Sequence, residues 1–239
     1  MKLIADKINI VESESAALTL ISEQQKNHTV SVVSFINAHA YTLAQSSPEF
    51  QYTLMQSDVL FRDGIGLKIL LKSYGLDCGY NANGTDLIPR VLEKLKHLKI
   101  CFIGTESPYI DDAMAISKQQ DINVVAQMNG FQDFNTMQLF VEKHQPDLLI
   151  LGMGMPKQEL FSLQLKKNYK LPLVVINGGA IFDFISGRFN RAPQFYRQYG
   201  LEWLYRLANE PIRLFKRYVI GIPKFMFILW THKFKERSD

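Results

Sequence analysis

The chain has 239 residues, of which 47% are hydrophobic and 21% are charged, and its net charge is +4 at pH 7. This composition excludes a disordered or fibrous protein and favours one sizeable α/β domain, with or without an appendage. No apolar run follows the polar residues after Met1, so we expect no secretion signal.

Short apolar runs alternate with longer amphipathic stretches along the first 200 residues. The runs predict strands at 30–36, 59–61, 99–103, 122–126, 147–151 and 173–176. The amphipathic stretches predict helices at 13–26, 64–74, 85–96, 108–119, 135–144 and 156–168. Ser13 is a suitable N-cap for the first helix. Strands that are apolar throughout and alternate with helices predict a doubly wound, mostly parallel, Rossmann-like α/β sheet.

Polar residues and glycines follow five of these strands. They form the segments 37–39, 62–64, 104–106, 152–159 and 177–179. Ligands of such a sheet bind outside the carboxyl ends of its strands, where backbone N–H groups and helix N-termini are exposed. We therefore expect the five segments to share one crevice that accepts a phosphate-containing ligand.

The basic character of the chain lies in its last 29 residues, which hold seven Lys or Arg and two Asp or Glu. Segments 200–208 and 211–218 have the pattern of basic amphipathic helices, and an apolar run interrupted by Pro223 and Lys224 follows. We divide the chain into a catalytic α/β domain at 1–200 and a helical appendage at 201–239.

The apolar run of this appendage is shorter than the ~20 residues that a membrane-spanning helix needs. Phe225, Phe227 and Trp230 stand among several cations, which is typical of a helix that lies at a membrane surface. A helix packed on the core with a solvated basic face is the alternative. The residues alone favour binding at a membrane surface, and the family resemblance described below implies a cytoplasmic protein that is peripheral on the inner face of the cytoplasmic membrane.

Asp63 is a candidate general base, because it stands at a strand end where a pocket can raise its pKa. The alternative is an ordinary Asp-Gly turn. Asn37 offers either a hydrogen bond to a substrate or a cap for the helix that begins at Ala38. Segment 84–86 resembles a helix start, and the glycines of 152–156 form a tight turn that is neither a Walker loop nor a G-x-G-x-x-G motif.

Several segments, read together, resemble the WecG/TagA/CpsF family of bacterial glycosyltransferases. They are FINAHAYTLA (35–44), the D-G-I core of FRDGIGL (61–67), NGTDLIP (83–89), FIGTE (102–106), MGMPKQE (153–159) and the long block 177–218, which includes RAP and GLEWLYRL. The resemblance covers residues 30–220. It implies an inverting transfer of a hexose, an N-acetylhexosamine or its uronate from a UDP-sugar to an undecaprenyl-diphosphate-linked sugar. Such reactions build teichoic acid, capsule or exopolysaccharide.

The resemblance also assigns roles to single residues. Asp63 matches the proposed general base. Expected substrate-binding residues are Asn37, Thr85, Asp86, Gly104, Gln158 and Asp183. Expected ligands of the lipid diphosphate are Arg191, Arg206, Arg213, Lys216 and Arg217. The expected partners are a UDP-sugar, a polyprenyl-diphosphate acceptor, an anionic membrane surface and, through association, further copies of the chain.

We expect neither a cofactor nor a bound metal. No His, Cys and Asp residues have metal-ligand spacing, and the D-x-D motif of many sugar-nucleotide transferases is absent. Basic side chains should therefore neutralise the pyrophosphate groups. Cys101 lies in an apolar run and is expected to be a buried thiol, which fits a reducing compartment. No nucleic-acid partner is expected.

Three positions depart from the usual family pattern: Asn81 and Lys216 replace arginines, and Phe35 replaces a threonine. They leave the transferred sugar open. Two other functions have different sequence requirements. A nucleotide-dependent oxidoreductase would need a G-x-G-x-x-G turn with an acidic residue about 20 positions later, which the chain lacks. A membrane-associated nucleotide-sugar-binding protein without activity remains the alternative.

Overall fold

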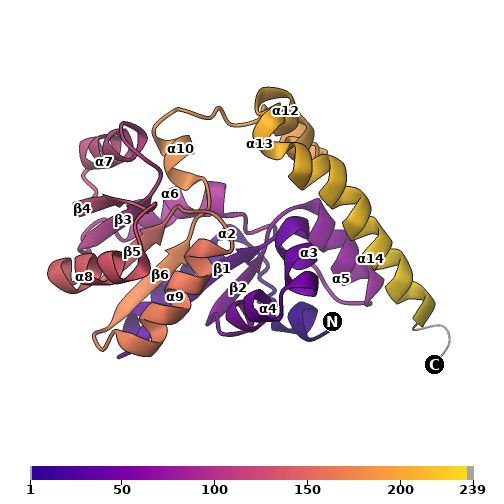
Figure 1. Cartoon of the computed structure of the whole chain (residues 1–239), viewed down its shortest axis with the longest axis horizontal. Helices are drawn as coiled ribbons and strands as arrows, with labels where there is room; N and C mark the ends of the chain where they lie inside the picture. Colours follow the sequence, from indigo (N-terminus) through magenta and orange to yellow (C-terminus); the bar gives the residue numbers. More distant parts are fainter. Residues whose placement is uncertain (1, 236–239) are drawn as a thin grey trace.

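The computed structural model describes residues 2–235, with the side chains of 3–231. A six-stranded parallel sheet lies between two layers of helices, and further helices extend from the C-terminal part of the chain (Figure 1). The strand order is β2-β1-β6-β5-β3-β4. The strands are β1 (Val30–Ile36), β2 (Val59–Arg62), β3 (Ile100–Gly104), β4 (Val124–Asn129), β5 (Leu148–Leu151) and β6 (Leu173–Asn177). The predicted doubly wound parallel sheet is confirmed.

Burial explains for which strands the predicted bounds agree with the observed bounds. Every residue of β1, β2, β3, β5 and β6 is buried. Strand β4 lies at the edge, and only Val124 of its residues is buried. The predicted range 122–126 was wrong at both ends, because pairing with β3 continues through polar Gln127 to Asn129 on the exposed edge. An apolar run in the sequence therefore indicates which residues are buried, but it does not show how far the backbone pairing of a strand extends.

One face of the sheet packs against helices α2 (Glu14–Glu23), α6 (Gly84–Lys94), α7 (Tyr109–Gln119) and α10 (Ile181–Ile185). The opposite face packs against α1 (Lys2–Lys7), α3 (Ala38–Ser46), α4 (Pro48–Met55), α5 (Ile65–Ser73), α8 (Phe134–His144) and α9 (Lys157–Asn168). Helices α1 and α4 were not predicted. Ser13 caps α2 as expected, since its Oγ accepts from the Ala16 N–H at 3.2 Å. Cys101 is fully buried, also as expected.

The C-terminal part folds into a short helical run. It consists of α11 (Gln194–Gln198), α12 (Glu202–Asn209), α13 (Pro211–Phe215), the π-helical turn η2 (Lys216–Ile220) and α14 (Gly221–Lys235). Pro223 does not interrupt the helix: it lies at the third position of α14, just after the wider π turn. None of the helices within 2–235 is long and apolar enough to span a membrane.

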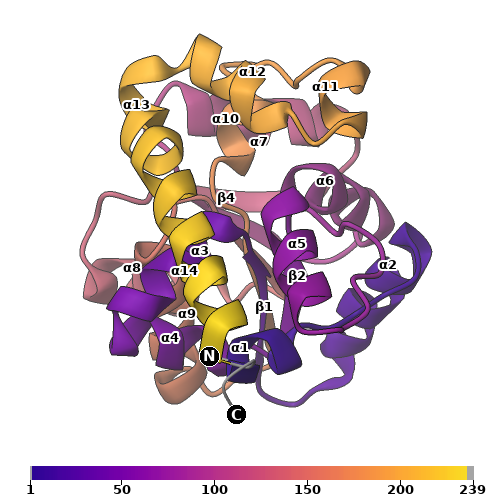
Figure 2. The same cartoon turned by 90° about the vertical axis from the view of Figure 1, so that its right-hand side faces the viewer.

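Helix α14 lies across the outer side of α3, as Figure 2 shows. Its inner face carries Phe225 and Leu229, which are buried in one cluster with residues of α3, α4 and α5. Phe225 meets the ring of Tyr41 edge-on, with the centroids 6.0 Å apart. The C-terminal helix is therefore attached to the α/β core by buried apolar contacts.

Candidate active site

The pairing of β1 with β2 places Asn37 beside Asp63. Ile36 is in register with Arg62, and the Asp63 N–H donates to the Ile36 carbonyl at 2.8 Å. Asn37 is the N-cap of α3, because its Oδ1 accepts from the Ala40 N–H at 3.0 Å. Its side-chain amide also hydrogen bonds to the Asp63 carboxyl. Asn37 therefore caps α3 and contacts Asp63 at the same time.

The surroundings of Asp63 make its carboxyl more basic. Burial raises the pKa of Asp63, and this effect exceeds the opposing influence of Arg217, the hydrogen bond from Asn37 and the charges of Arg206 and Arg191. A carboxylate with a raised pKa accepts a proton more readily near neutral pH. A raised pKa is what the expected role of Asp63 as a general base requires, and that role stays a prediction.

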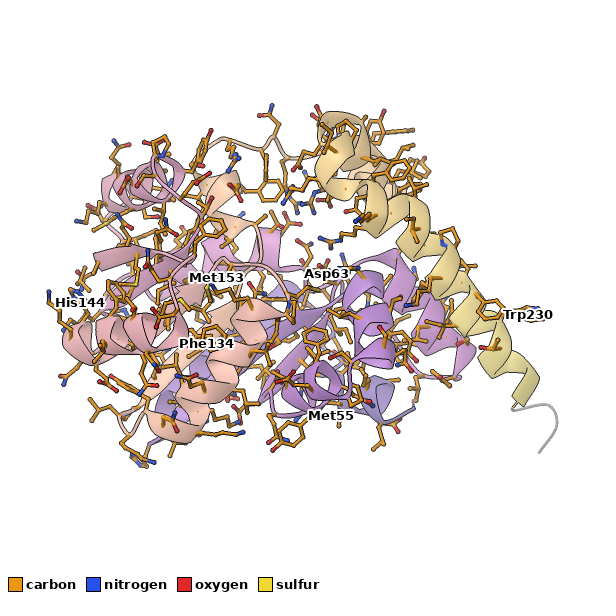
Figure 3. The ribbon with its side chains drawn as sticks, viewed as in Figure 1. Met55, Asp63, Phe134, His144, Met153 and Trp230 are labelled. Atoms are coloured by element: carbon orange, nitrogen blue, oxygen red, sulfur yellow. The ribbon has the colours of Figure 1, made fainter. Side chains whose placement is uncertain are left out.

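Asp63 lines a cavity of about 400 Å³ between the core and the C-terminal helices. In Figure 3 it lies between these two parts of the molecule. Of the predicted substrate-binding residues, Asn37 and Thr85 line the cavity. Of the predicted diphosphate ligands, Arg206 and Arg217 line it. The cavity therefore joins residues that are far apart in the sequence.

Arg206 and Arg217 have free hydrogen-bonding capacity at this cavity. The Nε of each is buried and has no hydrogen-bond partner among the described residues. Each guanidinium lies near an aromatic ring: Arg206 is 5.4 Å from the Phe184 centroid and Arg217 is 5.5 Å from that of Tyr218. Burial lowers the pKa of Arg217, and its nearness to Arg206 adds to this effect. Two like charges with unused donors form a site suited to an anion.

Arg191 makes a different set of contacts. It forms ion pairs with Asp86 of α6 and with Glu202 of α12, and it donates to the Asn83 Oδ1 at 3.1 Å. Burial acts in the opposite direction, but the hydrogen bonds from Arg191 and Asn83 lower the pKa of Asp86. The guanidinium group of Arg191 was expected to bind a diphosphate, but here it is paired with two carboxylates. In this structure Arg191 and Asp86 connect the core to the C-terminal helices.

Arg213 and Lys216 do not line the cavity. Arg213 pairs with Glu210 and lies 4.5 Å from the Phe189 centroid, while Lys216 is exposed. The basic residue Arg237 lies outside the described residues, as do the side chains of 232–235. Only part of the predicted cation cluster therefore faces the cavity.

Gln158 is buried beneath the carboxyl edge of the sheet and does not line the cavity. Its Oε1 accepts from the Gly154 N–H at 3.2 Å and from the Gly179 N–H at 3.0 Å. Its Nε2 donates to Glu159 at 2.8 Å. Gln158 therefore joins the loop after β5 to the loop after β6, and it positions both.

Gly104 is the last residue of β3 and Asp183 lies on α10, and neither residue lines the cavity. A Cβ at Gly104 would lie 2.3 Å from the Phe182 ring, so the glycine is needed for close packing. Asp183 accepts from the Thr105 hydroxyl at 3.2 Å and pairs with Arg188 at 3.1 Å. The five predicted strand-end segments thus do not share this cavity, because only the segments after β1 and β2 line it.

Sequence reasoning assigned no individual role to several residues of the cavity. His39 lines it, and burial together with nearby Arg217 lowers its pKa to about 4, so it is neutral at pH 7. Trp203 and Asn83 also line it. The place of His39 in the polar segment after the first strand was a usable signal. No signal in the sequence indicated Trp203, because the pattern of an amphipathic helix does not show which surface of the protein the helix covers.

The departures from the family pattern lie in different environments. Phe35 is a core residue, packed 5.9 Å from the Phe61 ring centroid. Asn81 lines the cavity, and its Oδ1 accepts from the Gly64 N–H at 2.7 Å and from Arg62 at 3.2 Å. Asn81 therefore holds the backbone just after Asp63.

Among the described residues, no group of three His, Cys, Asp or Glu side chains could hold a metal ion.

Comparison with known proteins identifies the family of this chain. The profile described as the glycosyl transferase WecG/TagA/CpsF family matches residues 2–239. The chain is also similar to the N-acetylglucosaminyldiphosphoundecaprenol N-acetyl-beta-D-mannosaminyltransferase of Bacillus spizizenii. The two are 28% identical over 195 residues, which cover 80% of this chain and 75% of that protein. The family match spans nearly the whole sequence, and the chain therefore belongs to the WecG/TagA/CpsF family of glycosyltransferases.

Proposed function

We propose that this glycosyltransferase moves a hexose, an N-acetylhexosamine or its uronate from a UDP-sugar to an undecaprenyl-diphosphate-linked sugar, with inversion. The observation that carries the proposal is the cavity in which Asp63 faces Arg206 and Arg217. The Bacillus relative is named for an acceptor of this kind, with GlcNAc on the lipid diphosphate. Such a reaction serves the synthesis of a cell-surface polysaccharide.

Asp63 acts as the general base in this mechanism. Its carboxylate takes the proton of the acceptor hydroxyl while the hydroxyl oxygen attacks the anomeric carbon of the donor. The bond from that carbon to the UDP oxygen breaks, and UDP leaves with the electron pair. Attack from the side opposite the leaving group inverts the anomeric centre. Asn37 holds the carboxyl in place through its side-chain amide.

Arg206 and Arg217 supply positive charge for diphosphate groups. Both residues line the same cavity as Asp63, and the Nε of each is buried without a hydrogen-bond partner among the described residues. Preorganised, partly desolvated cations of this kind stabilise negative charge. Because these cations can neutralise the phosphates, we propose a metal-independent transfer. Full activity in EDTA is the expected result, and a strict requirement for added Mg²⁺ or Mn²⁺ would overturn this part of the proposal.

We further propose that the protein is peripheral on the inner face of the cytoplasmic membrane. The outer side of α13, η2 and α14 carries exposed apolar side chains, and Ile212 keeps 97% of its surface exposed. Trp230 points away from the core in Figure 3. Phe215 and Phe227 are exposed on the same run of helices as the exposed cations Lys216 and Lys224. Exposed apolar and basic residues on one helical segment favour an anionic membrane surface.

The substitution Asp63→Asn tests the reaction. Sugar transfer, measured with radiolabelled UDP-sugars and a lipid-diphosphate-GlcNAc analogue, should fall at least ~100-fold, the lower range for losing a general base. UDP binding, measured by calorimetry, should survive. Asp112→Asn on the exposed side of α7 is the matched control and should leave both unchanged. Unchanged turnover in Asp63→Asn would refute the assignment.

The same experiment addresses the alternative function. A binding protein without activity would bind UDP in wild type and in both variants, and no sugar of the panel would be transferred. Transfer of one sugar by wild type would reject this alternative and would identify the donor.

A further inference from the structure

One side of the cavity is apolar. It is lined by Ile65 and Ile69 of α5 and by Ile222, Phe225 and Met226 of α14, and we call these five residues the apolar slot. Ile65, Ile69 and Met226 keep 45%, 44% and 49% of their surface exposed. Apolar side chains from two neighbouring helices thus border open space, although burying them would be favourable.

The floor of the slot is tightly packed. Phe225 is only 2% exposed and packs against Tyr41. A Cβ at Gly66 would lie 2.8 Å from the Ala38 Cβ and 3.4 Å from the Phe225 ring. The helices α3, α5 and α14 therefore meet closely below the slot. Its open side belongs to a preformed surface and does not result from loose packing.

The cavity brings three kinds of chemical group together. Asp63 lies at the end of β2, and Arg206 and Arg217 face it from the C-terminal helices. The slot begins at Ile65, two residues after Asp63, and Ile69 is one helical turn further, at about 6 Å. A ligand with a hydroxyl group, a diphosphate and an apolar chain presents matching groups.

We propose that the apolar slot binds the first isoprenoid units of the acceptor lipid, so that the enzyme itself and not only the bilayer holds them. This inference rests on the proposed function, because it extends the acceptor beyond its sugar and diphosphate. The exposed apolar side chains Ile212, Phe215 and Phe227 lie on the same helical run. The remainder of the lipid can therefore continue from the slot into the membrane.

Binding of two soluble probes separates the slot from the cation pair. Isothermal titration calorimetry compares farnesyl diphosphate, below its micellar concentration, with inorganic pyrophosphate, and no membrane or donor is present. Both probes meet the arginines, but only the first reaches the slot. Burial of a few isoprenoid carbons should tighten binding at least ~10-fold. Equal dissociation constants would overturn the proposal.

Variants of single slot residues test whether the difference in affinity between the two probes arises at the apolar slot. Ile69→Ser and Met226→Ser should each weaken farnesyl diphosphate binding about 5- to 10-fold. Pyrophosphate binding should not change, which also shows that the variants remain folded. The control is Phe227→Ser: Phe227 is 61% exposed on α14 but does not line the cavity, and this variant should bind both probes like wild type. An equal loss in Phe227→Ser would contradict a slot between the two helices.

Turnover distinguishes the slot from the reaction itself. GlcNAc-diphosphate acceptors with an ethyl or a farnesyl tail are compared in solution with the donor found in the panel. Wild type should prefer the farnesyl tail about 10-fold in kcat/KM, and Ile69→Ser should lose this preference while it keeps activity on the ethyl acceptor. If no acceptor receives a sugar but farnesyl diphosphate still binds through Ile69, the slot stands and the proposed function is wrong.

Discussion

Replacing Glu159 by glutamine tests the energetic cost of a buried polar cluster under the loops of the site. Glu159 is 2% exposed on α9, and its Oε1 accepts from Gln158 while its Oε2 has no hydrogen-bond partner among the described residues. Next to it, the Ser162 hydroxyl donates to the Asn177 Oδ1 at 2.8 Å, and Asn177 donates to the Ser34 hydroxyl at 2.9 Å. Burial raises the pKa of Glu159 from 4.5 to about 7.

The sign of the effect follows from the raised pKa. Between pH 4.5 and 7 the folded protein keeps the Glu159 proton while the unfolded chain has released it. Stability therefore falls as pH rises through this window, and the loss is complete above pH 7. The shift corresponds to about 3 kcal/mol at 1.36 kcal/mol per pH unit. Glu159→Gln removes this titration but keeps an acceptor for the Gln158 amide.

Urea unfolding at pH 5, 6, 7 and 8, followed by circular dichroism, gives the free energy of unfolding of both proteins. The variant minus wild-type difference should rise by about 2 to 3 kcal/mol from pH 5 to pH 8. Other groups titrate equally in both proteins and cancel. The matched control is Glu12→Gln at an exposed position, which should show no such trend. A Glu159→Gln difference constant within about 0.5 kcal/mol over this range would refute the reasoning.

Three further predictions concern packing, the link between the parts and the membrane. Gly104→Ala should lower the free energy of unfolding by about 1–3 kcal/mol, because its Cβ would meet the Phe182 ring at 2.3 Å; an unchanged urea midpoint would contradict this. Arg191→Gln removes the ion pairs to Asp86 and Glu202, although Asp86 keeps Arg197 at 3.7 Å. Hydrogen exchange in α12 should therefore accelerate about 10-fold, and equal protection would mean that the Arg191 ion pairs do not hold α12. Truncation after Asn209 should release the protein from anionic vesicles in a flotation assay while far-UV circular dichroism retains the signal of the core; continued binding would argue against the membrane role of the tail.

Much of the fold follows from local sequence patterns. Buried strands are apolar along their whole length, and caps such as Ser13 depend on neighbours within one turn, so both are readable from the sequence. The position of Asp63 after a strand end was readable for the same reason. That it lies beside Asn37 follows from the pairing of two consecutive strands. The family resemblance added the expected roles, and the family itself is confirmed.

Other features depend on partners that are distant in the sequence. Nothing near Gln158 indicates that its amide joins two loops, and nothing near Arg191 indicates that it bridges α6 and α12. The sequence also could not tell which side of α14 packs on the core, because both sides carry aromatic residues. The sequence by itself determined the sheet, the position of Asp63 at a strand end and the basic tail. Only the tertiary structure decided which cations face Asp63 and where the apolar slot lies, since both depend on how α14 docks against α3 and α5.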